Sequence, residues 1–333
     1  MLDERKAAIL QAVVEEYIQT AQPVGSGHVA DARGVDVSPA TVRNEMAQLE
    51  TEGYLSQPHT SAGRVPTQQG YRFFVDHLRD PLRLAAPSAH QVRAFFERAH
   101  GEVEEMLGAT GRLLSNLTDL ASVVVSQPSS DATIRSVQLV GLNASTGLVI
   151  VVLSDGVVEK HTVELPEGIG QERLAAATAH LSTFLTGELR AALPTVPNSG
   201  DESTDRAIAN ACAALTDPKI AEPEHVYVEG TARVAQAFDA IETVREVLGL
   251  LEQQYVVVTL LRDVLDRGLH VAIGSETGVE PLADCSLVVA PYDVEGRRLG
   301  TIGVLGPTRM NYPQTLAAVA VVSDRLSDRL AEG

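Results

Sequence analysis

Residues 38–67 read SPATVRNEMAQLETEGYLSQPHTSAGRVPT, and they carry the strongest structural signals in the N-terminal part of the chain. Ser38 is suited to cap a helix, since its hydroxyl can accept a hydrogen bond from a free backbone N–H of the first turn. Pro39 follows at the first helical position, where the N–H that proline lacks would be unpaired in any case. We therefore predict a helix from Ser38 to about Glu52.

The residues after this helix predict a β-hairpin. Leu55 begins a first strand, Ser61-Ala62-Gly63 has the composition of a turn, and Val65 begins a second strand. Thr67 then opens another helix. The hairpin is the expected wing of a winged helix.

Two further helices are predicted upstream. Apolar residues at Ile9, Val13 and Tyr17 recur at helical spacing, and a shorter helix from about Ser26 to Ala32 ends before Gly34. The order helix, helix, turn, helix and hairpin is that of a winged helix-turn-helix.

The helix from Ser38 has two distinct faces. At 100° per residue, Val42, Met46 and Leu49 share an apolar stripe, and the other side carries Ala40, Arg43, Asn44, Ala47 and Gln48. Arginine pairs with guanine or a phosphate, asparagine and glutamine pair with adenine, and alanines allow close approach to a DNA groove. The outer face is typical of a recognition helix, although Arg43 could instead pair with Glu50 and Asn44 could be only solvated.

The stretch from Ser38 to Leu78, SPATVRNEMAQLETEGYLSQPHTSAGRVPTQQGYRFFVDHL, closely resembles the HrcA heat-shock repressors. The resemblance implies a homodimer that binds double-stranded DNA at an inverted-repeat operator, called CIRCE, upstream of chaperone genes. It also implies that the chaperonin GroEL helps to keep the repressor active. In such proteins the winged helix precedes a GAF-like domain that carries an inserted dimerising domain.

We expect an α+β fold with the winged helix at residues 1–80. The GAF-like domain would span 81–165 and 225–333, and a helical dimerisation insert would span 166–224. The candidate DNA-binding residues are Ser38, Ala40, Thr41, Arg43, Asn44, Ala47, Gln48, His59, Thr60, Ser61, Arg64 and Arg72.

The rest of the chain carries periodic apolar segments. Residues from Phe96 to Leu120 repeat at spacings of three and four, which predicts a long helix that either pairs two subunits or, as we favour, packs on its own sheet. Runs at 135–143, 147–154 and 157–165 predict an antiparallel meander. Further strands are expected at 225–230, 270–275, 285–292 and 299–307, before a helix at about 313–330.

Composition describes an ordinary globular protein with aliphatic cores, since 44% of its 333 residues are hydrophobic and only 4% aromatic. The formal net charge of −18, of which −4 falls within residues 1–80, argues against a strongly basic DNA-binding surface. Residues 55–75, however, contain His59, Arg64 and Arg72 and no acid, so DNA binding can use this local positive region. A charged N-terminus and the lack of a long apolar run predict a cytoplasmic protein.

Catalysis, metal binding and cofactors receive no support from the sequence. Cys212 and Cys285 lie far apart without histidine spacing, which favours buried free thiols. The glycines of residues 300–306, GTIGVLG, do not match a phosphate-binding loop and favour a strand. Two other functions stay open: a regulator with a small-molecule sensor of the GAF type, and a winged helix that binds proteins.

Overall fold

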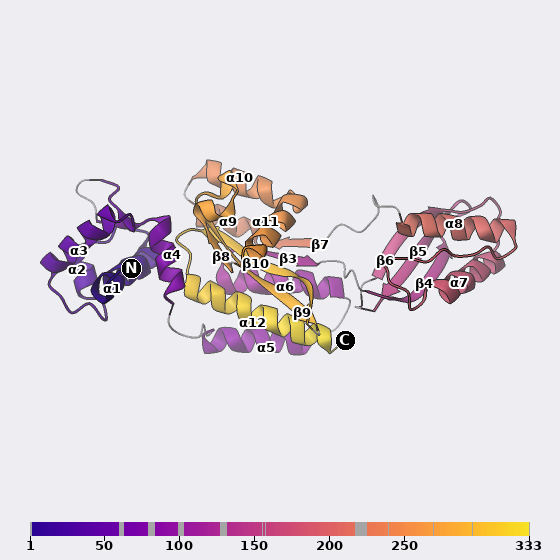
Figure 1. The fold of residues 1–333 in the computed structure, drawn as a ribbon, viewed down its shortest axis with the longest axis horizontal. Coiled ribbons are helices and arrows are strands. Elements are labelled where there is room, and N and C mark those ends of the chain that lie inside the picture. The colour runs from indigo at the N-terminus through magenta and orange to yellow at the C-terminus, as the bar shows by residue number, and fades with distance from the viewer. Residues whose placement is uncertain are drawn as a thin grey trace.

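The computed structural model describes residues 2–59, 63–78, 84–98, 103–126, 132–154, 156, 158–216, 225–238, 240–268, 270–294 and 296–332. They form three units in a row: an N-terminal helical unit, a central unit around a five-stranded sheet, and a distal unit around a three-stranded sheet (Figure 1). The mixture of helices and sheets is the predicted α+β class.

The N-terminal unit is the predicted winged helix. Its elements are α1 (Glu4–Thr20), α2 (Ser26–Ala30), α3 (Pro39–Thr51), β1 (Leu55–Ser56), β2 (Val65–Pro66) and α4 (Gln68–Asp76). Strands β1 and β2 pair antiparallel as the hairpin. The backbone of Arg64 also pairs with that of Val24 through two hydrogen bonds of 2.9 Å, which ties the wing to the loop before α2.

Two glycines allow this unit to pack closely. A Cβ atom on Gly63 would lie 2.3 Å from the carbonyl oxygen of Val24, and one on Gly70 would lie 2.3 Å from that of Tyr54. Neither contact is possible for a residue with a side chain, because the opposing atoms belong to the backbone. The wing and the start of α4 therefore both depend on glycine.

The central unit is a fully antiparallel sheet with helices on both faces. Its strand order is β7-β3-β10-β9-β8. The elements are α5 (Ala86–Arg98), α6 (Val103–Thr118), β3 (Ala121–Ser126), β7 (His225–Glu229), α9 (Thr231–Ala237), α10 (Ile241–Leu251), α11 (Gln254–Asp266), β8 (Val271–Ile273), two short 3-10 turns η1 (Gly274–Thr277) and η2 (Glu280–Leu282), β9 (Cys285–Val294), β10 (Arg297–Pro307) and α12 (Tyr312–Ala331).

Alternate residues of the central strands point to opposite faces of the sheet and pack into two separate hydrophobic cores. Val124 of β3 packs with α5, α6 and α12, whereas Val123 and Val125 pack with α9, α10 and α11. The expected long helix is two helices, α5 and α6, which each contact α12. The interpretation that α6 packs on its own sheet is confirmed.

The distal unit contains β4 (Ile134–Gly141), β5 (Thr146–Leu153), β6 (Val158–Glu164), α7 (Gln171–Leu185) and α8 (Glu202–Thr216). The meander is antiparallel as predicted. The expected boundary at residue 166 would place the meander in the central unit. Instead, its strands form a separate sheet, which shares a core with α7 and α8. The insertion is therefore an α+β unit that includes 132–165, because the inner face of the meander is covered by its own helices.

Within the described ranges, no helix is long and apolar enough to cross a membrane. The glycine-bearing segment at 300–306 lies in β10, as predicted, where a Cβ on Gly300 would meet the carbonyl oxygen of Val125 at 2.1 Å. Cys285 is buried and Cys212 half-buried, and both are free thiols.

Candidate DNA-binding surface

Helix α3 is held in place by its cap and its inner face. The Ser38 hydroxyl accepts a hydrogen bond from the Thr41 backbone N–H at 3.2 Å, as an N-cap should. Val42, Met46 and Leu49 are buried in the winged-helix core. These contacts fix the rotation of α3 and hence which residues face outward.

The outer face of α3 carries the residues predicted from the sequence. Exposed side chains are those of Ala40, Arg43, Asn44, Ala47 and Gln48, and Thr41 is half-buried beside the cap. Helix α3 lies at the end of the molecule away from the central unit, which meets the winged helix through α4 (Figure 1). Nothing in the described part of the chain covers the recognition face.

The acids of α3 and of its C-cap residue are each paired with a cation. Glu45 lies 3.7 Å from Arg5, Glu50 lies 2.8 Å from Arg64, and Glu52 lies 2.5 Å from Lys6. Arg5 and Lys6 come from α1, so the first helix offsets the negative charge of the third. This role of α1 was not predicted, because the helical spacing of its basic residues does not indicate which acids they contact.

Arg64, which the sequence places in a stretch without acids, contacts an acid of α3 in the folded chain. Its Nε atom lies against the carboxylate of Glu50, and its backbone pairs with Val24. Glu50 therefore pairs with Arg64 and not with Arg43, for which the described residues provide no ion pair. His59 is exposed at the wing, and the predicted contacts Thr60 and Ser61 lie outside the described residues.

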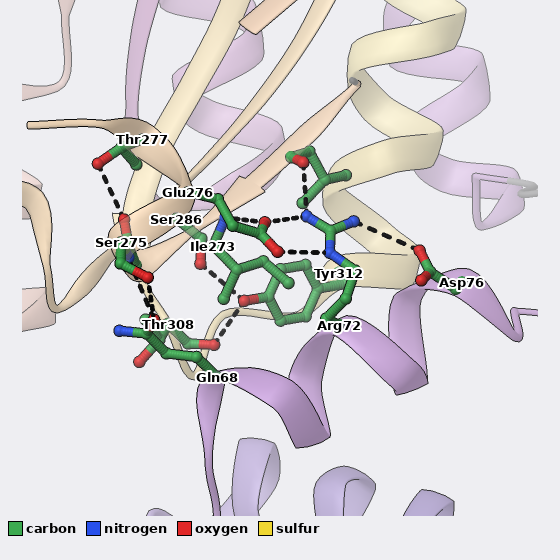
Figure 2. Close-up of polar contacts among 12 residues, drawn as sticks. Gln68, Arg72, Asp76, Ile273, Ser275, Glu276, Thr277, Ser286, Thr308 and Tyr312 are labelled. Carbon is green, nitrogen blue, oxygen red and sulfur yellow. Dashed lines mark hydrogen bonds and ion pairs between the residues drawn. The ribbon is translucent and has the colours of Figure 1, made fainter. Parts of the chain in front are cut away.

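Arg72 does not lie with the other candidates. It projects from α4 towards the central unit, where its guanidinium contacts Glu276 and the carbonyl oxygen of Val271 (Figure 2). The structure thus brings together the α3 residues and places Arg72 at an interface between two units. Sequence reasoning could not find this partner, because it is 204 positions away.

The comparisons with known proteins agree with this arrangement. Residues 1–77 match the family model described as the winged helix-turn-helix transcription repressor, HrcA DNA-binding, and residues 104–316 match that of the HrcA protein C-terminal domain. A solved structure described as a hypothetical protein at 2.2 Å resolution shares the fold, with a TM-score of 0.70 and 21% identity over 100% of this chain and 99% of that one.

Curated relatives are similar along the whole chain. The heat-inducible transcription repressor HrcA of Moorella thermoacetica is 36% identical over 339 residues, covering 99% of this chain and 98% of the relative. The HrcA of Streptomyces avermitilis is 36% identical and covers 100% of both chains, and that of Nocardia farcinica is 37% identical and covers 99% and 97%. The chain belongs to the HrcA family of heat-inducible transcription repressors, non-enzymatic regulators that bind DNA through a winged helix.

Proposed function

We propose that this repressor binds the CIRCE inverted repeat as a homodimer, through the outer face of α3, and thereby blocks transcription of chaperone genes. The observation that carries the proposal is the exposed row of Arg43, Asn44 and Gln48 on a capped helix whose acids are already neutralised. These exposed side chains do not pack in the protein core, and they are of the types that bind base edges in the major groove.

The proposed roles follow from chemistry and position. Arg43 would contact guanine or a phosphate, and Asn44 and Gln48 would pair with adenine. Ala40 and Ala47 would allow close approach of the helix. Ser38 and Thr41, at the N-terminus of α3, would lie near a phosphate, because the free N–H groups of a helix start attract anions.

The wing would hold the register on the DNA backbone. His59, with Thr60 and Ser61 beside it, is available for phosphate or minor-groove contacts. In the absence of DNA, Arg64 rests on Glu50, and a phosphate would have to replace that carboxylate. Arg72 is not part of this proposed surface.

Dimerisation through the distal unit is supported by its exposed apolar side chains. Leu142, Phe184 and Leu189 are 58%, 37% and 45% exposed, and all three belong to this unit. A second copy would cover them, and two recognition helices related by a two-fold axis suit an inverted repeat. Modulation by the chaperonin GroEL rests on the family resemblance alone, as does a GAF-like role for the central unit.

The proposal predicts sequence-specific binding that depends on Arg43. At about 150 mM salt, the protein should prefer a CIRCE duplex to a scrambled duplex by about 10³-fold or more. Arg43→Ala should reduce that preference by roughly 1–3 kcal/mol, as expected for a lost base contact. Fluorescence anisotropy with both duplexes measures it, and Arg93→Ala, which removes an exposed arginine of α5, is the matched control.

Equal binding of both duplexes, with and without added GroEL, would contradict the operator assignment. A loss of affinity for both duplexes alike in Arg43→Ala would place Arg43 on a phosphate instead of a base.

A further inference from the structure

The winged helix is joined to the central unit by a polar interface around Arg72. Its Nε atom donates to Glu276 Oε1 at 2.9 Å, and its Nη2 donates to the Val271 carbonyl oxygen at 2.8 Å and to the other Glu276 oxygen (Figure 2). The carboxylate is held from its own side by the Ile273 backbone N–H at 2.9 Å. Both ends of this bidentate pair are therefore fixed in direction.

A second side chain of α4 reinforces the interface. Gln68 Oε1 accepts from the Ser275 N–H at 3.1 Å and from its hydroxyl at 2.8 Å, while Gln68 Nε2 donates to the Ala283 carbonyl oxygen at 3.1 Å. A Cβ on Gly274 would lie 2.1 Å from the Gln68 amide nitrogen. The turn after β8 is thus shaped to receive Gln68.

Apolar packing lies beneath the polar contacts. The rings of Tyr71 on α4 and Tyr312 on α12 are 5.8 Å apart, and both side chains are buried. Tyr312 is held in turn by Ser286 and the Thr308 carbonyl oxygen, each at 2.7 Å. The apolar core of the winged helix is continuous here with that of the central unit.

The interface lies on α4, whereas the recognition face lies on α3 and stays exposed in the docked arrangement. Docking therefore sets the direction of α3 relative to the central unit without covering it. In a dimer, such docking on both subunits would set the angle and separation of two recognition helices.

We propose that Arg72 and Glu276 form an orientation clamp, which positions the winged helix on the central unit so that two copies match both halves of an inverted repeat. The inference rests on the proposed dimeric binding of that operator. Arg72 is a positioning residue here and touches no DNA. Releasing the clamp would leave each recognition helix intact but add the entropy cost of orienting two winged helices at the moment of binding.

The test compares a full inverted repeat with a half-site duplex over a range of salt concentrations, using the intact protein. Arg72→Ala should weaken binding to the full repeat by about tenfold, through lost preorganisation, and binding to the half-site by less than about twofold. Glu276→Gln should act in the same direction, and Arg72→Glu combined with Glu276→Arg should recover part of the loss. Glu229→Gln, which removes the charge partner of Arg112 within the central unit, should change neither.

Hydrogen exchange reports the docking directly. The Ser275 amide, which donates to Gln68, should exchange faster in Arg72→Ala and Glu276→Gln, while amides of β9 and β10 keep their protection. This separates loss of docking from loss of fold.

The salt dependence separates positioning from a phosphate contact. If Arg72 bound a phosphate, Arg72→Ala would weaken both duplexes and reduce the salt slope by about 0.9, and Glu276→Gln would not weaken binding. That result, or tighter binding by Glu276→Gln, would overturn the clamp. Equal affinity of the wild type for full repeat and half-site would instead contradict the proposed dimeric function.

Discussion

Glu159 of β6 is buried between two nitrogen-bearing side chains in the distal unit. Arg190 Nε lies 2.9 and 2.7 Å from the two carboxylate oxygens, and His161 Nε2 lies 3.0 Å from one of them. Burial raises the pKa of Glu159, but the hydrogen bonds from His161 and Arg190 outweigh it and hold the pKa below its ordinary value. The ionised carboxylate therefore stabilises the folded unit.

Glu159→Gln should destabilise the distal unit at pH 7 by about 1–3 kcal/mol, because Arg190 loses a buried charged partner. The folded-state pKa is depressed, so the contribution of Glu159 is fully present above about 4.5, its ordinary pKa, and is lost as the pH falls through the lower folded value. Hydrogen exchange of β4–β6 amides in wild type and variant, at pH 7 and at decreasing pH, measures the difference. A gap between the two proteins that stays constant with pH would contradict this account.

At the scale of single elements, α3 is specified mainly by local signals. Ser38 caps it, Pro39 begins it, and the buried triplet Val42, Met46 and Leu49 orients it. Thr67 caps α4 in the same local way, and its hydroxyl also donates to the Gly53 carbonyl oxygen, 14 positions away, at 2.6 Å. Caps and helical apolar stripes are readable from sequence, because they join residues a few positions apart.

Ser38→Ala should destabilise the winged helix by about 1 kcal/mol, since the first turn of α3 loses the acceptor for the Thr41 N–H. Ser38→Asn, which caps about as well, should restore most of the loss. Hydrogen exchange of α3 amides without DNA is the measurement, so that any contact of Ser38 with DNA does not enter. Equal protection in wild type and Ser38→Ala would show that the cap contributes nothing.

At the scale of the whole molecule, the distal unit is inserted where a hairpin turn would otherwise stand. Strands β3 and β7 are antiparallel neighbours, and Ser126, the last residue of β3, pairs with His225, the first of β7. The chain leaves and re-enters the central sheet at one place. The distal unit has its own core, so the central sheet does not need it to complete its strand order.

Replacing residues 127–224 with Asn-Gly should leave the winged helix and central unit folded, because that dipeptide forms the two-residue turn of a β-hairpin. Half-site binding should match that of the full chain within about twofold, since α3 and its docking are unchanged. If the distal unit makes the dimer, the shortened protein should be a monomer and lose its preference for the full repeat. Light scattering and anisotropy check both, and a shortened protein that still dimerises would move the dimer contact to the central unit.

The features of the fold that the sequence did not predict depend on contacts between distant segments. The strands of the meander were predicted, but their separation from the central sheet was not. Alternating apolar residues indicate a strand with one buried face, but they do not indicate which helices cover that face. Strand β3 was not predicted, since a short apolar run such as ASVVVS after a helix carries no periodicity of its own. Both omissions concern pairing between distant segments.

Caps, helical periodicity and turn residues act over a few positions, so the sequence alone was enough to predict the winged helix and the outward-facing residues of α3. The resemblance of residues 38–78 indicated the family. The ion pairs that join Arg5 and Lys6 to the acids of α3 and its C-cap, Arg64 to Glu50 and Arg72 to Glu276 depend instead on the packing of the folded chain. A single charged side chain belongs to no periodic pattern in the sequence that would identify its partner. Its partner depends on how helices, strands and units pack together, and buried apolar surfaces elsewhere in the chain drive that packing.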